Sequence, residues 1–458
     1  MGFHLGRAHL TCGGARVTKL DVDAILAELK GFQRDAVDHV IDRLYDAPDA
    51  GRRFLVADET GLGKSVVARG VIARAIEKLE DDATVDRIDI VYVCSNADLA
   101  QQNLQRLNVT GNKHLAMTGR LTLLALQSRR LAGVRVDRKI VNLVSFTPGT
   151  SFEMGSWRTG TSEERALLHI ILTEALQLPA TKQRASRLIF QGPVRKMSSF
   201  EYRIDRVRRE LAGPVHAPIL GSFIAGATER GLLARYLTLA DELAGRRQIA
   251  QDRVYRVRQL TAELRAELAR ASVATLEPDL VILDEFQRFR HLLDPENGGE
   301  AAELAHHLFD YQAAKVLLLS ATPYKAYTSR QSDAEEDHYS DFMTTLEFLS
   351  QGSPTMLVDV KRLFSEYREG IINGRSVDEA AAALRRTLLT LMSRTERPVI
   401  HDMVEDQAIT SAPPATGDLN GYAGLQALAD ELGIPMSLDY WKSIPQFGNF
   451  MDTYQIAR

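Results

Sequence analysis

The sequence has little cysteine, no long apolar run and no excess of positive charge. Its two cysteines, Cys12 and Cys94, are too few for a disulfide framework or a cysteine-rich zinc site, which favours a reducing compartment. No apolar run approaches the ~20 residues that a membrane-spanning helix needs, and Met1 to Lys19 lack the uninterrupted apolar stretch of a signal peptide. We therefore expect a cytoplasmic protein with free thiols, no membrane association and no structural zinc.

The balance of charge argues against a chain that binds nucleic acid over its whole surface. Fifty-six Lys and Arg stand against sixty Asp and Glu, which gives a formal charge of −4. Any contact with nucleic acid therefore has to be local. The 458 residues, of which 45% are hydrophobic and 25% charged, have the composition of a globular protein of about two or three domains. This composition excludes the disordered, collagen and coiled-coil classes.

Short apolar runs rich in β-branched residues alternate with longer helical patterns. A parallel sheet is buried on both faces, so its strands are nearly continuous apolar segments, as these runs are. The alternation predicts an α/β fold in which helices cover both faces of a parallel sheet. The strand candidates are residues 53–57, 88–94, 140–146, 280–283 and 316–320.

The helical patterns divide the chain further. Between the third and fourth strand candidates the spacing becomes helical with many charges, which predicts a large helical insertion. After Pro323 the chain is acidic and loop-like, then helical again from Val377 to Met392. We expect an N-terminal segment at 1–30, the sheet domain at 31–150 and 277–330, the insertion at 151–276, and a helical and loop extension at 331–458.

A glycine-rich loop joins the first strand candidate to a helix that we expect to begin near Val66. A strand, a glycine loop and a helix in this order are what a phosphate-binding loop requires. Gly61 and Gly63 allow backbone torsions that are closed to other residues, so consecutive amides can point at phosphate oxygens. Lys64 would then lie on the β and γ phosphates of ATP, and the Ser65 hydroxyl would be a ligand of Mg²⁺.

The loop departs at one position from the general pattern G-x-x-x-x-G-K-[ST], because Asp58 stands where the first glycine is expected. A Gly-Leu-Gly turn that Lys-Ser follows by chance is the alternative to a nucleotide loop. The residues that would surround the phosphates are Thr60, Gly61, Leu62, Gly63, Lys64 and Ser65.

Two acidic residues, Asp284 and Glu285, end the fourth strand candidate, where α/β sheets place their chemistry. Adjacent carboxylates repel each other and lose hydration there, so they need a compensating cation. Mg²⁺ with nucleotide phosphates would supply it: Asp284 would hold the metal through its water shell, and Glu285 would orient or deprotonate the attacking water. Alternatively, the pair begins a helix near Phe286 and interacts with the helix dipole.

The fifth strand candidate ends in small residues, Ser320, Ala321 and Thr322. Alone, this is an ordinary exit from a strand into a turn. The glycine loop, the acidic pair and this turn nevertheless follow one another in sequence, each at the end of a strand candidate. Their combination favours a single nucleotide site over three chance occurrences.

In this combination the sequence resembles the first motor domain of superfamily 2 helicases and translocases, over about Phe32 to Tyr324 without the insertion. The SWI/SNF-type branch is the more similar one, since Ala57 to Ser65 resembles its loop A-D-E-x-G-L-G-K-[ST]. In that loop an aspartate stands in the place of Asp58. The resemblance implies a RecA-like sheet domain that uses ATP and Mg²⁺.

The resemblance also implies roles for single residues. Gln33, in the segment Gly31 to Ala36, would recognise adenine. Asp284 and Glu285 would keep their metal and water roles, and Gln287 would take the fourth place of the Asp-Glu box, where the family has His or Asp. Ser320 to Thr322 would couple hydrolysis to movement.

Several segments are candidates for contact with nucleic acid or metal. Residues 91–96 and 146–151 resemble loops that touch the nucleic-acid backbone, although each is equally consistent with an ordinary polar loop. The basic clusters at 203–209 and 253–258 contain interleaved acidic residues, which favours solvated helix faces over phosphate contacts. His306 and His307 diverge by roughly 100° on a helix, so they do not predict a metal site.

A complete motor of this kind has a second RecA-like domain, whose arginines lie in a Gln-x-x-Gly-Arg-x-x-Arg element. No such element occurs between Ala326 and Arg458, and the nearest pair, Arg394 and Arg397, is expected on a helix surface. We therefore expect an ATP-hydrolysing motor half with weak activity of its own, which acts on nucleic acid, with duplex DNA as the expected substrate, and pairs with a second RecA-like domain in cis or in trans. The alternative is an ATP-gated scaffold that binds a partner without translocating.

Overall fold

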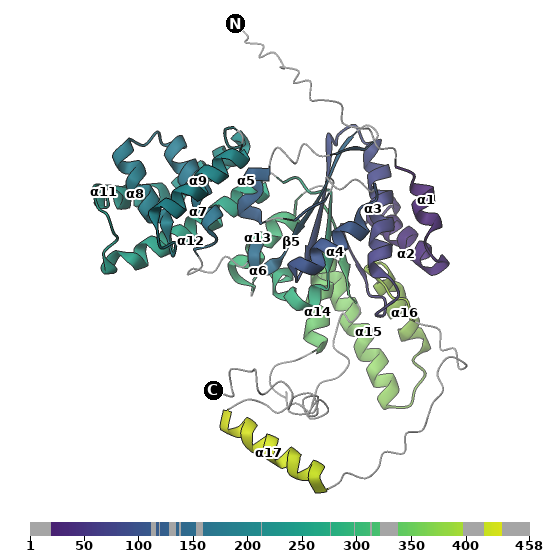
Figure 1. The fold of residues 1–458 in the computed structure, drawn as a ribbon. Coiled ribbons are helices and arrows are strands. Elements are labelled where there is room, and N and C mark those ends of the chain that lie inside the picture. Colours follow the sequence, from purple (N-terminus) through teal and green to yellow (C-terminus); the bar gives the residue numbers. More distant parts are fainter. Residues whose placement is uncertain are drawn as a thin grey trace. The chain divides into compact units, whose positions relative to one another are not determined.

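The chain has an α/β fold in the computed structural model, with strands at the centre and helices around them (Figure 1). The structure describes residues 20–110, 116–118, 120–127, 134–136, 139–152, 159–211, 213–274, 276–296, 298–311, 314–320, 338–396 and 416–432.

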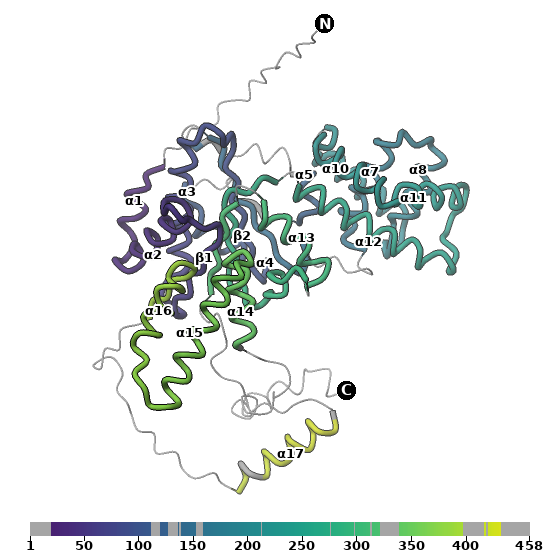
Figure 2. The backbone as a smooth tube through the Cα atoms, turned by 180° about the vertical axis from the view of Figure 1, so that it is seen from behind, coloured from purple at the N-terminus to yellow at the C-terminus, as the bar shows by residue number. Residues whose placement is uncertain are grey.

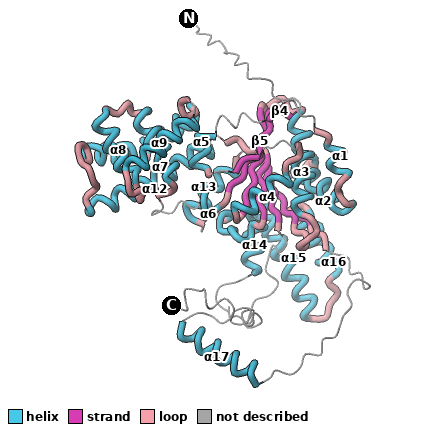
Figure 3. Tube along the Cα trace, in the orientation of Figure 1, coloured by secondary structure: helices cyan, strands magenta, loops and turns pink. Residues whose placement is uncertain are grey.

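Strands β3, β5, β2, β6, β7 and β1 lie side by side in this order and form a six-stranded parallel sheet. Figure 3 draws the strands in magenta. The short β8 adds to the sheet in parallel beside β1, and β4 pairs with β5 in the antiparallel sense. The predicted α/β fold is confirmed, and each of the five strand candidates is a strand. The strands are β1 (Arg53–Val56), β2 (Arg87–Cys94), β3 (Ala116–Thr118), β4 (Val134–Val136), β5 (Lys139–Phe146), β6 (Leu280–Asp284), β7 (Lys315–Leu319) and β8 (Met392–Ser393).

Both faces of the sheet are buried, because apolar side chains alternate between two hydrophobic clusters. On one face Val56, Ile90 and Leu319 pack with helices from the first quarter of the chain, which group together in both Figure 1 and Figure 2. These helices are α1 (Val22–Ala27), α2 (Gly31–Ile41), the π-helical turn η1 (Asp42–Asp46), α3 (Lys64–Glu80) and α4 (Ala97–Leu107).

On the other face Leu55, Val93 and Leu283 pack with elements from the second half of the chain. These are η4 (Phe286–Leu293), α13 (Gly299–Phe309), α14 (His338–Leu349), α15 (Pro354–Ile372) and α16 (Asp378–Leu389). The helix expected to reach Met392 ends at Leu389, and Met392 begins β8, for which the apolar pattern held no signal.

Helices α7 to α12 lie between β5 and β6 in sequence and confirm the predicted helical region. They form a separate core around Phe190, Phe223 and Tyr236. A buried ion pair 2.7 Å long joins Glu164 of α7 to Arg265 of α12. The helices are α7 (Ser162–Ala175), α8 (Ala180–Gln191), α9 (Met197–Leu211), α10 (Ala217–Glu229), α11 (Leu232–Glu242) and α12 (Gln251–Ala274).

Residues after the fifth strand candidate divide between two compact units. Residues 342–396 belong to the unit that contains the sheet, whereas 324–341 and 397–458 belong to a second unit, in which α17 (Thr416–Leu432) is described. Among the helices that the structure describes, none combines the length and the apolarity that crossing a bilayer requires. The remaining short helices are η2 (Leu121–Leu123), α5 (Leu124–Gln127) and α6 (Pro148–Ser151).

Candidate functional site

The carboxyl ends of β1, β7 and β6 bring the predicted site motifs to one edge of the sheet. Val56 is in register with Leu319, and Leu319 with Asp284. The backbone continues this order beyond the strands, since the amide of Ser320 donates to Val56 O at 3.1 Å and the amide of Glu285 to Leu319 O at 3.0 Å. At one strand spacing per step, the glycine loop and the acidic pair begin about 10 Å apart.

The glycine loop has the left-handed torsions that its sequence predicts. Gly61 and Gly63 both have φ of 87°, a region that other residues rarely enter. The helix α3 begins at Lys64, slightly earlier than expected, so Lys64 and Ser65 form its first turn. The Lys64 ammonium donates back to the loop, to Asp58 O at 3.1 Å and to Glu59 O at 3.5 Å. The backbone of the loop therefore curves around the Lys64 side chain.

Gln33 lies against this loop although it is far from it in sequence. Its amide nitrogen Nε2 donates to Leu62 O at 2.8 Å, and its Oε1 accepts from the Lys30 amide at 3.0 Å. A Cβ on Gly63 would come within 2.6 Å of the Gln33 nitrogen, so this contact needs glycine for space as well as for torsion. The structure thus brings Gln33 and the loop together, as the sequence predicts.

Asp58, the residue that replaces the usual glycine, is fully buried and holds the segment after β8. Its Oδ1 accepts from the Thr395 amide at 2.8 Å, and the neighbouring Glu59 amide donates to Thr395 O at 3.2 Å. The second carboxylate oxygen, Oδ2, has no hydrogen-bond partner. The departure from glycine therefore has a structural reason, because the side chain fixes a neighbouring segment to the loop.

Asp284 is the last residue of β6 and is held from two other elements. The Tyr92 hydroxyl of β2 donates to its Oδ2, and so does the Asn103 amide of α4, at 3.3 Å. Burial to 7% exposure raises the pKa of Asp284, and the charge of Glu285 raises it further, whereas the hydrogen bond from Tyr92 and the charge of Lys64 oppose this. The lysine of the glycine loop thus acts electrostatically on this carboxylate.

Glu285 adopts a strained backbone conformation immediately after Asp284. Its φ is 54°, which is unusual for a residue other than glycine and concentrates at functional positions. The helix η4 does begin at Phe286, as the alternative interpretation expects, but the Glu285 side chain makes no capping hydrogen bond to it. The carboxylate accepts instead from the amide of Gln287, whose own Oε1 is buried without a partner.

Ser320, the first residue of the coupling motif, is buried at the end of β7 between the loop and the acidic pair. Ala321 and Thr322 lie outside the described residues, as does Arg397. Arg394 is described, and the helical context expected for it is wrong: it follows β8 outside any helix and pairs with Glu396 at 2.9 Å, and the next residue, Thr395, bonds to the glycine loop.

Buried polar atoms without partners gather at this edge of the sheet. Among the residues that the structure describes, eight buried side-chain nitrogen or oxygen atoms have no hydrogen-bond partner. Each such atom costs free energy that a ligand would offset, but the strands concerned range from β5 to β8, so the atoms mark the carboxyl edge as a whole and not one point on it. Five of the eight lie at or just beyond the carboxyl ends of strands: Asp58 Oδ2, Ser145 Oγ, Ser151 Oγ, Gln287 Oε1 and Ser393 Oγ.

The two candidate nucleic-acid segments, 91–96 and 146–151, lie at the carboxyl ends of the neighbouring strands β2 and β5. The loop after β2 caps α4, where Asn96 accepts from the Asp98 amide at 2.8 Å, and the loop after neighbouring β5 forms the short α6. Ion pairs offset part of the charge of the basic clusters, since Arg203 pairs with Glu163 at 3.0 Å, and Arg253 and Arg256 share Glu242.

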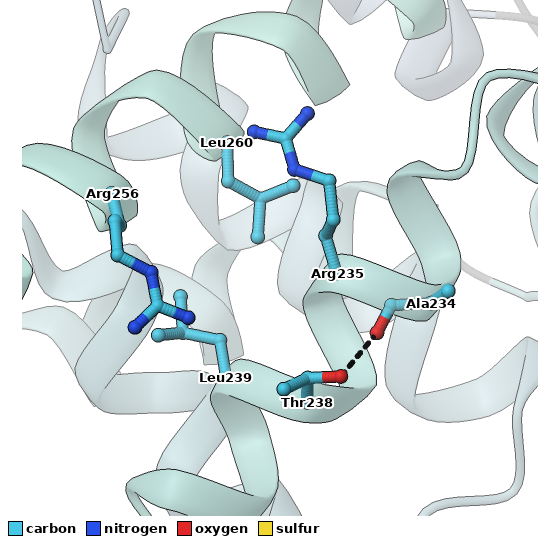
Figure 4. Close-up of a pocket in the computed structure, with 6 residues that line it drawn as sticks. All are labelled: Ala234, Arg235, Thr238, Leu239, Arg256 and Leu260. Carbon is cyan, nitrogen blue, oxygen red and sulfur yellow. Dashed lines mark hydrogen bonds between the residues drawn. The ribbon is translucent and has the colours of Figure 1, made fainter.

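A pocket of about 350 Å³ lies elsewhere, between α11 and α12 (Figure 4). Two arginines line it: Arg235 pairs with Glu263, and Arg256 shares Glu242 with Arg253, so their charges are partly compensated. Within the described ranges, no three His, Cys, Asp or Glu side chains are grouped so that they could hold a metal ion. The carboxyl edge of the sheet is thus the better candidate site.

Sequence reasoning missed three residues that build this edge. Tyr92 lies inside an apolar strand run, where its hydroxyl gives no pattern, and Asn103 lies on the helix α4, beyond the candidate segment 91–96. Thr395 binds Asp58 through its backbone amide, which no sequence pattern reports. The one available signal was the hydroxyl of Tyr92, a polar group in a strand that is mostly apolar and buried.

Comparison of the chain with models of protein families and with curated proteins finds no match to either.

Proposed function

We propose that the chain binds Mg-ATP at the carboxyl edge of its sheet and hydrolyses it as half of a helicase or translocase motor that acts on nucleic acid, with duplex DNA as the expected substrate. The observation that carries this proposal is the convergence of three elements on one edge. The glycine loop with Gln33, the turn at Ser320 and the pair Asp284 and Glu285 occupy the ends of adjacent strands.

The residues at this edge fit a magnesium ion bound together with phosphates. Mg²⁺ prefers oxygen ligands and is usually held by one or two carboxylates and substrate phosphates, not by a cage of protein side chains. Ser65 and Asp284 supply a hydroxyl and a carboxylate at this edge. Burial raises the pKa of Asp284, and a bound metal would stabilise its charged form. A water on that metal would give the unpaired Gln287 Oε1 a hydrogen-bond donor.

Each protein group has a role in this proposal. Lys64, whose ammonium now bonds only to backbone carbonyls, would turn to the β and γ phosphates. Glu285, oriented by Gln287, would position or deprotonate the attacking water. Gln33 already touches the loop and would read the adenine edge with its amide. When bound, the metal would neutralise charge on the transferred phosphoryl group.

The motor half needs a further positive charge for full activity. Arginine fingers are typically worth ~10³ to 10⁵ in rate, and a second RecA-like domain, in cis or in trans, would supply them. The alternative is an ATP-gated scaffold that binds a partner without translocating. A scaffold would bind nucleotide without any stimulation by nucleic acid.

The test begins with nucleotide binding by the purified chain. We expect Lys64→Ala to weaken Mg-ATP binding by about one to two orders of magnitude, because it removes charge-assisted hydrogen bonds to the phosphates. Lys182→Ala is the matched control, since Lys182 pairs with Asp241 in the insertion at 2.7 Å. Equal affinities in all three proteins, measured by titration calorimetry, would defeat the proposal.

The second part measures ATP hydrolysis with duplex DNA, single-stranded DNA and RNA, each with and without a supplied second RecA-like domain. Weak activity alone and stimulation by duplex DNA support the motor. Stimulation by RNA alone overturns the assignment to duplex DNA, and binding without any stimulation favours the scaffold. A strong DNA-stimulated rate that Lys64→Ala leaves unchanged excludes the proposed site.

A further inference from the structure

Two side chains that the proposed chemistry does not itself use converge on the carboxylate of Asp284. Tyr92 comes from β2, whose Cys94 is in register with Asp284, and its side chain is 1% exposed. Asn103 comes from the second half of α4. The Asn103 amide donates to the Tyr92 hydroxyl at 2.8 Å and to Asp284 Oδ2 at 3.3 Å, while the Tyr92 hydroxyl donates to the same Oδ2. The three polar groups therefore form a closed triangle.

The triangle restricts how the carboxylate can turn. The last torsion of an aspartate side chain is broad, so a single hydrogen bond leaves the plane of the carboxylate poorly defined. Here two donors from different elements act on one oxygen, and neither of them engages Oδ1. A phenol hydroxyl carries its proton at neutral pH, so Tyr92 can act as a donor to Oδ2.

We propose that Tyr92 and Asn103 are positioning residues that fix the Asp284 carboxylate, so that Oδ1 faces the water shell of the nucleotide-bound magnesium. The inference rests on the proposed function and adds the two residues that set the geometry of its metal site. Partners in the outer shell of a metal typically account for about 10-fold to 100-fold in metal affinity. Because Asn103 belongs to α4, this helix is tied to the metal-holding carboxylate.

A purely structural role has a different expectation. A buried tyrosine hydroxyl needs an acceptor, and Asp284 could serve Tyr92 simply as that acceptor. In that case removal of the hydroxyl would lower the stability of the fold and leave metal binding unchanged. The chain offers a matched control in Tyr236, which is also fully buried and donates to Ser186 Oγ in the insertion at 2.7 Å.

The experiment compares the full chain with Tyr92→Phe, Asn103→Ala and Tyr236→Phe. The first readout is the affinity for a non-hydrolysable ATP analogue in the presence of magnesium and in the presence of a chelator. The second is the affinity of the protein and analogue together for Mn²⁺, measured by electron paramagnetic resonance. We expect Tyr92→Phe and Asn103→Ala to weaken Mn²⁺ binding about tenfold and the chelated analogue hardly at all, while Tyr236→Phe changes neither.

Unchanged Mn²⁺ affinity in both site variants would overturn the positioning role. Asn103 is only half-buried, so its variant keeps the test decisive should Tyr92→Phe fail to fold. Failure of the proposed function has a separate signature, because the unaltered chain would then bind no analogue under either condition. That result would remove the metal site and the positioning role together.

Discussion

The carboxyl edge of the sheet and the helical insertion treat buried polar groups in opposite ways. At the edge of the sheet, Asp58 and Gln287 each leave an oxygen buried without a partner. In the insertion, none of the described residues between 159 and 274 has such an atom. There Glu164 accepts from Arg265, Thr122 and the Thr161 amide at once, and His169 bonds to Ser186 at 2.8 Å.

This difference in hydrogen bonding distinguishes a candidate binding site, at the edge of the sheet, from a region with a structural role, in the insertion. A buried polar group without a partner costs about 1 to 3 kcal/mol, so a fold retains several of them in one place only where something compensates for them. The described residues 159–274 of the insertion satisfy their buried polar side chains, in part through contacts such as that of Glu164 with Thr122 outside the insertion. Changes at the edge should therefore alter ligand binding more than stability, whereas changes to the polar groups of the insertion should do the reverse.

The largest expected effect is the loss of the buried ion pair of the insertion. Arg265→Met would remove the shorter of the two ion pairs of the buried Glu164 carboxylate and leave only the partly exposed Arg120, 3.6 Å away, so we expect a loss of up to about 3 to 5 kcal/mol of unfolding free energy. Urea denaturation would show this as a lower midpoint, and nucleotide affinity of the folded variant should be unchanged. The double variant Glu164→Leu with Arg265→Met should recover part of the loss, because it removes the buried carboxylate, whereas Arg120 and Arg165 lose the negative charge beside them. A single variant as stable as the original would break the comparison.

The second effect is sensitivity to acid in the insertion. Burial, aided by the charges of Arg187 and Arg208, lowers the pKa of His169 from 6.5 to about 3. The unfolded chain therefore binds a proton below pH 6.5 that the folded chain rejects until about pH 3, so this residue contributes stability that is lost as the pH falls through that window. Between pH 6.5 and pH 5 the loss is about 2 kcal/mol.

His169→Gln isolates this contribution. Glutamine can keep a hydrogen bond to Ser186 but does not titrate, so the variant should lose less stability between pH 7 and pH 5 than the original chain does. Thermal unfolding at several pH values measures the difference. If both proteins lose the same amount, His169 is not the acid-sensitive group.

The sequence was sufficient for the fold class and for the parts of the site that lie on strand ends. Apolar runs identified β1, β2, β5, β6 and β7 because a strand buried on both faces must be apolar throughout. The glycines at 61 and 63 indicated the loop because few other residues tolerate its torsions. Such signals are local, since the residues of one short segment are enough to predict its own conformation and burial.

The parts that the sequence did not reveal depend on contacts between distant segments. The two-residue β8 exists because Leu55 and Ala57 donate to Leu391 O and Ser393 O, and nothing within Met392-Ser393 demands a strand. The partnership of Tyr92 with Asp284 joins residues 192 positions apart in sequence. Arg394 was expected on a helix for the same reason, because the strand that precedes it, β8, forms only by pairing with β1.

The smallest expected effect concerns Asp58. One of its carboxylate oxygens has a hydrogen-bond partner, as polar groups of the insertion do, and the other has none. Asp58→Asn keeps an oxygen that can accept from the Thr395 amide, so stability should change by less than about 1 kcal/mol. It removes a negative charge from the loop whose carbonyl holds Lys64, and like charges near a triphosphate repel it. Nucleotide affinity, measured by calorimetry, should therefore rise a few-fold, more at low salt than at high salt. A loss of stability with unchanged affinity would instead group Asp58 with the internally satisfied polar residues of the insertion.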